Sequence, residues 1–159
     1  MPLTTNRVKS GALVLSATAL ITLAVNEGFS DHAYIPVKGD VPTIGYGETQ
    51  GVKMGDRITA IDALKALNRD VAVYENDIKK CIKVPLSQNE FDAYVDLAYN
   101  IGPGAFCSST LVRRLNHGDY ALACRSILDW NKFHGAVLPG LTKRRQAEYY
   151  TCMGINKNV

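Results

Sequence analysis

An uncharged, apolar stretch near the N-terminus constrains this chain more than any other feature. Residues 10–26 carry no charge, and residues 11–25 are rich in Ala, Ser, Thr and Gly, with Arg7 and Lys9 before them. This pattern is typical of an export signal. A helix of about 15 residues is only about 22 Å long, shorter than the roughly 30 Å hydrocarbon core of a bilayer. We therefore expect the stretch to anchor the chain weakly in a membrane.

Two other interpretations of this stretch stay open. A cleavable signal peptide needs small residues before the cut, and Ser16-Ala-Thr-Ala19 offers one such pair. That pair lies inside the apolar run, so cutting there would leave apolar residues stranded, and we expect an uncleaved segment. The stretch could also be an ordinary buried first helix. One chain could adopt the membrane-inserted state and the buried-helix state at different times.

The rest of the chain changes from strand patterns to helix patterns. Short β-type runs at residues 33–37 and 43–47 flank a turn-forming segment. Thr59 and Asp62 form a capping-box pattern that opens one long helix. Ser87 and Glu90 form a second capping-box pattern, which opens a helix that stops at Gly102. Shorter helices are also expected around residues 111–115, over 119–130, and from Thr142 to about 153, after a loop at Pro139-Gly140.

This order of elements predicts an α+β fold. We expect a small antiparallel β-lobe over about residues 28–57 and a helical lobe over about 59–154, joined by the long helix. The length of 159 residues and the 47% apolar content suit one domain, here residues 27–159, preceded by the segment 1–26. A cleft between two lobes is where ligands usually bind.

Composition excludes several functional classes. The net charge is +3, and the only tight cationic run is Lys143-Arg144-Arg145, which favours acidic polymers but lacks the interleaved aromatic residues of a nucleic-acid site. The three histidines are scattered and no C-x-x-C pair occurs, so we expect no metal and no cofactor. We also expect a monomer that does not bind nucleic acid.

Two carboxylates and a hydroxyl are the candidates for catalysis. Cleaving a glycosidic bond needs a general acid and a second carboxylate that activates water or attacks the sugar. Glu27 ends the apolar segment, where neighbours such as Val25 and Phe29 would desolvate it and keep it protonated. Asp40 lies in the expected turn, a wetter setting that suits an ionised base, and Thr43 could orient a water. Taken singly, each of these residue types is more often structural.

Seven short motifs together strengthen the prediction that Glu27, Asp40 and Thr43 are catalytic. They are NEGF at 26–29, AYI at 33–35, TIGYG at 43–47, NIGPGAF at 100–106, STL at 109–111, RRLN at 113–116 and GLTKRR at 140–145. In this order and spacing they resemble the phage T4-type lysozymes of glycoside hydrolase family 24. The likeness is greatest to lambdoid signal-anchor-release (SAR) endolysins, and it spans residues 24–154.

The resemblance implies a lysozyme-like fold and a role for each candidate. It implies that Glu27 is the acid, Asp40 the base and Thr43 a holder of the attacking water in an inverting reaction on peptidoglycan glycan strands. The family's Asp commonly lies nine residues after the Glu and six before the Thr, whereas Asp40 is thirteen after and three before. Asp31 is a poor substitute because it lies too close to Glu27 to face it across a substrate.

The resemblance also gives the apolar segment a function. It implies export to the host periplasm, transient tethering to the inner membrane through residues 11–25, and release. While residues 11–25 are in the bilayer, Glu27 would lie at its surface, so we expect the tethered form to be inactive. A lytic transglycosylase, which needs one acid and no activated water, and a non-catalytic, membrane-tethered wall-binding module remain alternatives.

The four cysteines suit an exported protein with disulfide bonds. Cys107 and Cys124 are expected on consecutive helices that form a hairpin, so we predict that they pair. Cys81 and Cys152 then remain for the second bond. The alternative is a set of reduced, buried thiols.

Overall fold

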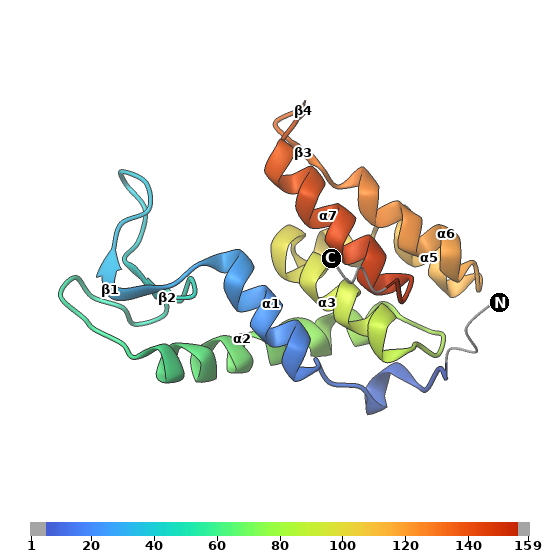
Figure 1. Cartoon of the computed structure of the whole chain (residues 1–159), viewed down its shortest axis with the longest axis horizontal. Helices are drawn as coiled ribbons and strands as arrows, with labels where there is room; N and C mark the ends of the chain where they lie inside the picture. The colour runs from blue at the N-terminus through green and yellow to red at the C-terminus, as the bar shows by residue number, and fades with distance from the viewer. Residues whose placement is uncertain (1–5, 156–159) are drawn as a thin grey trace. The chain divides into compact units, whose positions relative to one another are not determined.

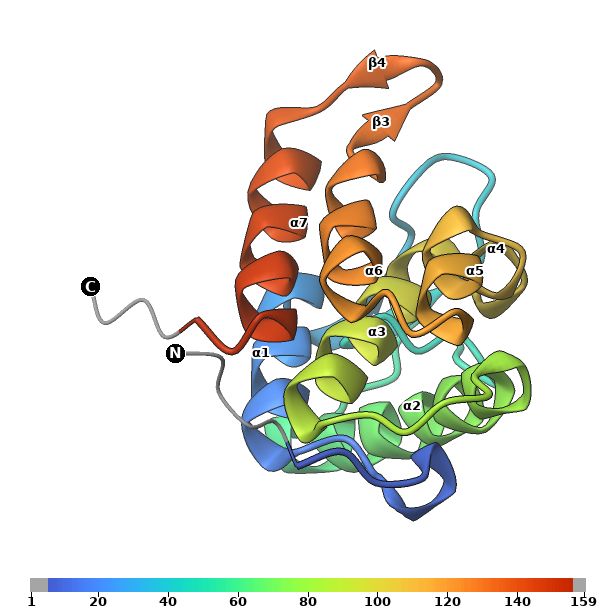
Figure 2. The same cartoon turned by 90° about the vertical axis from the view of Figure 1, so that its right-hand side faces the viewer.

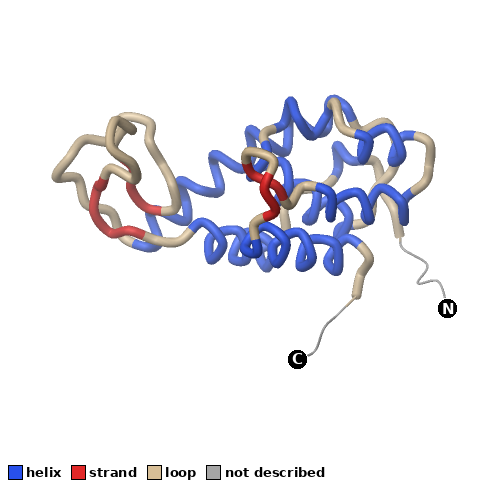
Figure 3. Tube along the Cα trace, turned by 90° about the horizontal axis from the view of Figure 1, so that it is seen from above, coloured by secondary structure: helices blue, strands red, loops and turns tan. Residues whose placement is uncertain are grey.

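The computed structural model describes residues 6–155. Figure 1 shows a largely helical chain, and Figure 3 shows two small pairs of strands among the helices. Within the described residues both sheets are antiparallel and two-stranded, which confirms the predicted α+β class. By their contacts the residues form two compact units, one of Ala17–Val73 and one of Met1–Ser16 with Tyr74–Val159.

The unit Ala17–Val73 begins with a helix and a hairpin. Helix α1 covers Ala17–Glu27, strand β1 covers Ser30–Tyr34 and strand β2 covers Thr43–Gly45, with Tyr34 opposite Thr43. The first strand ends earlier than predicted because Pro36 has no N–H to donate to a ladder. Its residues also bond on their other side, where the Ala33 N–H donates to the Asp56 carbonyl. Figure 3 shows the long loops around this hairpin.

The predicted long helix is helix α2, which covers Ala60–Cys81 and contributes residues to both units. It begins where the sequence indicates, since the Thr59 hydroxyl accepts a hydrogen bond from the Asp62 N–H at 3.1 Å. The same hydroxyl donates to the Asp62 carboxylate at 2.9 Å. The start of this helix is therefore confirmed.

The second unit is built on the buried helix α3, Gln88–Ile101. Its predicted capping box is confirmed, because Ser87 accepts from the Glu90 N–H while the Glu90 side chain accepts from the Ser87 N–H. Helix α3 contacts helix α7, Pro139–Cys152. Around it lie helix α5, Thr110–Asn116, helix α6, Tyr120–Ser126, and the 3-10 turn η2, Ile127–Asp129.

Three local features of this unit differ from the sequence expectation. Pro103–Cys107 forms a short helix, α4, with Pro at its first turn, where the missing N–H is tolerated. For the same reason α7 starts at Pro139 and not at Thr142. A small hairpin of β3, Lys132–Phe133, and β4, Ala136–Val137, connects η2 to α7. Helices α6 and α7 lie side by side in Figure 2.

The unexpected helix α4 also explains why the predicted disulfide pairing is wrong. The bonds are Cys81–Cys107 and Cys124–Cys152, each with a Cα–Cα distance of 5.7 Å. Because α5 intervenes between Cys107 and Cys124, these residues are not on consecutive helices. Cys107 instead ends α4 against the last residue of α2, and Cys124 on α6 meets the last residue of α7. All four cysteines are oxidised, so the reduced alternative is wrong as well.

The N-terminal apolar stretch does not form one continuous helix in this structure. A 3-10 turn, η1, covers Ser10–Ala12, the backbone is extended around Leu13, and α1 starts only at Ala17. Within residues 6–155, no helix combines the length and the apolar character required to span a bilayer.

Candidate active site

All three predicted catalytic residues belong to the unit Ala17–Val73. Glu27 is the last residue of α1, and Gly28 closes that helix with a positive φ of 77° and an N–H donated to the Ala24 carbonyl. The chain then enters β1 at Ser30. Glu27 therefore lies where a helix gives way to a strand, as the sequence predicts.

Asp40 and Thr43 lie beyond the other end of β1. Asp40 is exposed, follows Gly39 at φ 96°, and donates its N–H to the Val37 carbonyl at 2.9 Å in a tight turn. Thr43 starts β2 and is 7% exposed. The loop thus brings Asp40 and Thr43 to one end of the hairpin, whereas Glu27 precedes its opposite end.

The Thr43 hydroxyl has a defined orientation. It donates to the Val41 carbonyl at 3.2 Å, so its hydrogen points back at the loop. The oxygen keeps lone-pair capacity and can accept a hydrogen bond from a water. This hydroxyl can therefore hold a water as an acceptor.

The expected apolar enclosure of Glu27 is not present in this structure. The Glu27 side chain is exposed, and its neighbours Val25 and Phe29 are 75% and 45% exposed. Instead, Phe29 packs on Tyr46, with the ring centroids 5.3 Å apart.

A shallow pocket lies next to β2 in the same unit. It is lined by Gly45, Tyr46, Glu48, Ala63, Leu67 and Asp70. A tight turn builds it: Ile44 and Glu48 exchange backbone hydrogen bonds, and Gly45 adopts φ 63°, where an added Cβ would lie 3.0 Å from the Ala63 Cβ.

Two further charged groups of the pocket region were missed by the sequence reasoning. Asp70 lines the pocket from α2, and the Arg69 guanidinium lies 4.0 Å from the Glu48 carboxylate. Both residues look like ordinary polar positions of an amphipathic helix, so the sequence carried no signal for them. The pocket offers carboxylates and one aromatic ring, groups that bind sugar hydroxyls and sugar faces.

The cationic run 143–145 is not a surface patch. Arg145 is fully buried and donates to the Asn100 side chain, and Arg144 is paired with Asp96 at 2.7 Å and with Glu148 at 3.3 Å. Only Lys143 of the three is exposed. The two arginines of the run therefore contact side chains inside the unit, and the run does not form a continuous cationic surface.

Comparisons with known proteins agree with this fold. The sequence model of the phage lysozyme family matches residues 24–148. An endolysin of Acyrthosiphon pisum secondary endosymbiont phage 1 is 41% identical over 138 residues, which cover 84% of this chain and 94% of that protein. A SAR-endolysin of Pseudomonas phage phiKMV is 38% identical over 141 residues, covering 86% and 87%.

Solved structures are similar too. An endolysin from Escherichia coli O157:H7 phage FAHEc1 superposes with a TM-score of 0.80 at 36% sequence identity. The match covers 94% of this chain and 97% of that one. The expectation of a lysozyme-like fold is thereby confirmed.

Proposed function

The chain belongs to the phage lysozyme family, and on that premise we propose that it is an endolysin with N-acetylmuramidase activity. It hydrolyses the β-1,4 bond between N-acetylmuramic acid and N-acetylglucosamine in peptidoglycan, and so lyses the host cell. The observation that carries this proposal is the family match over residues 24–148, which includes the helix end at Glu27 and the hairpin with Asp40 and Thr43.

We assign one role to each of the three residues. Glu27 gives a proton to the departing glycosidic oxygen. Asp40, which is exposed, takes a proton from the attacking water, and Thr43 holds that water through its hydroxyl oxygen. Water attacks the face opposite the leaving group, so the product has inverted configuration. Since Glu27 is exposed in the free chain, the bound glycan itself displaces water from it.

Mass analysis of digested peptidoglycan tests the reaction class. We expect products with reducing ends, each heavier than an anhydro-sugar product by one water. Anhydro ends would contradict the proposal and indicate a transglycosylase, and an undigested wall would indicate a binding module. The same digest read by NMR gives the anomeric configuration of the fresh end, for which we expect inversion.

The identity of the base is tested with a matched pair of variants. Asp31 and Asp40 are both exposed carboxylates of the same unit, and Asp31 contacts His32 at 2.7 Å. We expect Asp40→Asn to lower the hydrolysis rate by about 10²- to 10⁴-fold and Asp31→Asn to leave it within a few-fold of the parent. The reverse result would assign the base to Asp31.

We also propose that the chain is exported and tethered through residues 11–25 before release into the periplasm. The uncharged composition of this segment and the SAR-endolysin relative support this. In the tethered state α1 is not available to hold Glu27 at the hairpin, so the chain is inactive. Equal specific activity in membrane and soluble fractions would contradict this proposal.

A further inference from the structure

Residues 7–16, which precede α1, bind other residues of the second unit through backbone and side-chain hydrogen bonds. We call these residues the N-terminal strap. Val8 and Leu86 exchange backbone hydrogen bonds at 2.9 and 2.8 Å, and Leu13 is buried. The strap belongs to the same compact unit as the groups that bind it.

Carboxylates on α2 and α3 capture the end of the strap. Glu75 accepts the Leu15 N–H at 2.6 Å, and Asp92 accepts both the N–H and the hydroxyl of Ser16, at 3.0 and 2.6 Å. Both carboxylates are less than 10% exposed. The strap carbonyls are also bound, because Lys79 donates to the Leu13 carbonyl and Gln88 to that of Val14.

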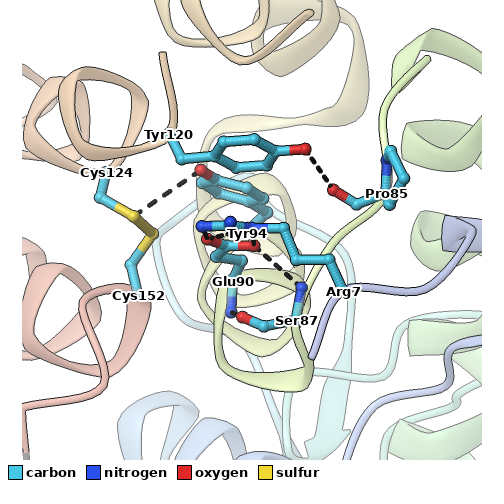
Figure 4. Close-up of polar contacts among 8 residues, drawn as sticks. All are labelled: Arg7, Pro85, Ser87, Glu90, Tyr94, Tyr120, Cys124 and Cys152. Atoms are coloured by element: carbon cyan, nitrogen blue, oxygen red, sulfur yellow. Dashed lines mark hydrogen bonds and ion pairs between the residues drawn. A yellow bond between two sulfur atoms is a disulfide. The ribbon is translucent and has the colours of Figure 1, made fainter. Parts of the chain in front are cut away.

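Arg7 closes the other end of the strap (Figure 4). Its Nη2 lies 2.7 Å from Oε1 of Glu90, and its Nε lies 3.0 Å from Oε2. The guanidinium carbon lies 3.6 Å from the centre of the Tyr120 ring, whose hydroxyl donates to the Pro85 carbonyl. The Glu90 side chain is only 4% exposed, so Arg7 neutralises a nearly buried carboxylate.

We propose that the strap stabilises the released state of this protein and so acts as a lock against reinsertion into the membrane. The Arg7–Glu90 pair is the contact that completes this lock. The role in release rests on the proposed tethering. In the tethered state Arg7 and Lys9 lie on the cytoplasmic side of the membrane, while Glu90 lies on the opposite side. The pair can form only after the whole segment has left the bilayer, and once formed it opposes reinsertion.

Lys9 provides the matched control. It is exposed, carries the same charge as Arg7 and flanks the same apolar segment. Arg7→Gln and Lys9→Gln therefore weaken the cationic flank equally, but only the first removes the contact with Glu90. Any effect on membrane insertion that depends only on charge should be the same in both variants.

Hydrogen exchange on the purified chain tests the lock without a membrane or a wall. In Arg7→Gln we expect the amides of Val8, Leu86, Leu15 and Ser16 to lose about tenfold protection, while amides of α6 and α7 keep theirs. Lys9→Gln should match the parent. No loss in Arg7→Gln, or an equal loss in both variants, would overturn the lock.

A second substitution tests the same contact from the other side. Glu90→Gln can still accept the Ser87 N–H, so it keeps the helix cap while removing the charge. We expect the double variant Arg7→Gln/Glu90→Gln to lose no more protection than either single variant, because the two residues act through one contact. Additive losses would contradict the pairing.

Fractionation of expressing cells then tests the role in release. We expect Arg7→Gln to leave a larger membrane-bound fraction than Lys9→Gln, and equal fractions would overturn this role. We expect the same loss of amide protection when Arg7→Gln is made in a Glu27→Gln background, where the proposed catalysis is absent. A failure of the lock and a failure of the glycosidase proposal are therefore separable.

Discussion

At the scale of single residues, the catalytic proposal depends on how the hairpin orients small groups. Thr43 illustrates this, because its hydroxyl hydrogen is donated to the Val41 carbonyl. Only the lone pairs of the hydroxyl oxygen are then left to accept a hydrogen bond from a water. The sequence could suggest Thr43 only through the resemblance of its surrounding motif. The orientation of the hydroxyl depends on the turn before β2 and had no signature in the sequence.

This orientation leads to a prediction for two substitutions at position 43. Thr43→Ser keeps the acceptor oxygen and should retain most of the hydrolysis rate. Thr43→Val is nearly isosteric but has no acceptor, so we expect a loss of about 10- to 100-fold, mainly in kcat, because the water is misplaced. Steady-state hydrolysis of purified peptidoglycan measures this. Equal rates for the two variants would exclude a water-holding role.

At the scale of elements, the sequence predicted those helices whose ends carry a chemical signal. The Ser87 and Glu90 box, the Thr59 cap and the stop at Gly102 are all local patterns, and each is found as predicted. Helix α4 was not predicted, because Gly-Pro-Gly at its start is typical of a loop. The hairpin of β3 and β4 was not predicted, because each of its strands has only two residues. Disulfide pairing depends on that missed helix, so it could not be predicted correctly.

The contact between α3 and α7 buries a charge cluster that includes Arg144 and Arg145 of the cationic run 143–145. Glu148 on α7 is 2% exposed and faces Arg144, Arg145 and Asp96. Burial, together with the nearby Asp96 carboxylate, raises the pKa of Glu148 from 4.5 to about 8. Within the described residues its Oε2 atom and two nitrogens of Arg145 have no hydrogen-bond partner.

The raised pKa predicts how stability depends on pH. Between pH 4.5 and about 8 the folded state holds a proton on Glu148 that the unfolded state releases. Stability from this group is therefore complete below pH 4.5 and is lost as the pH rises toward 8, by on the order of a few kcal/mol. Glu148→Gln cannot titrate and should flatten this slope in urea unfolding at pH 5 and pH 8. The same slope in parent and variant would contradict the assignment.

At the scale of the whole molecule, we propose that one N-terminal segment occupies two environments in turn. Its composition is apolar enough to act as an anchor, yet in the folded chain α1 buries only Leu23 and Ala24 and leaves Ile21 and Val25 more than half exposed. The sequence could indicate both a membrane anchor and a first helix, because both depend on the apolar composition of this segment. It could not reveal the strap, because its partners Glu75, Glu90 and Asp92 lie far away along the chain.

The proposed hydrolysis of peptidoglycan depends above all on Glu27 as the general acid. The most direct test is the rate at which purified, soluble protein releases reducing ends from peptidoglycan, compared between the parent, Glu27→Gln and the control Asp119→Asn. Asp119 is an exposed carboxylate whose side chain does not cap α6. We predict a loss of about 10²- to 10⁴-fold for Glu27→Gln and a parental rate for Asp119→Asn. A Glu27→Gln variant that keeps the parental rate would show that Glu27 is not the general acid.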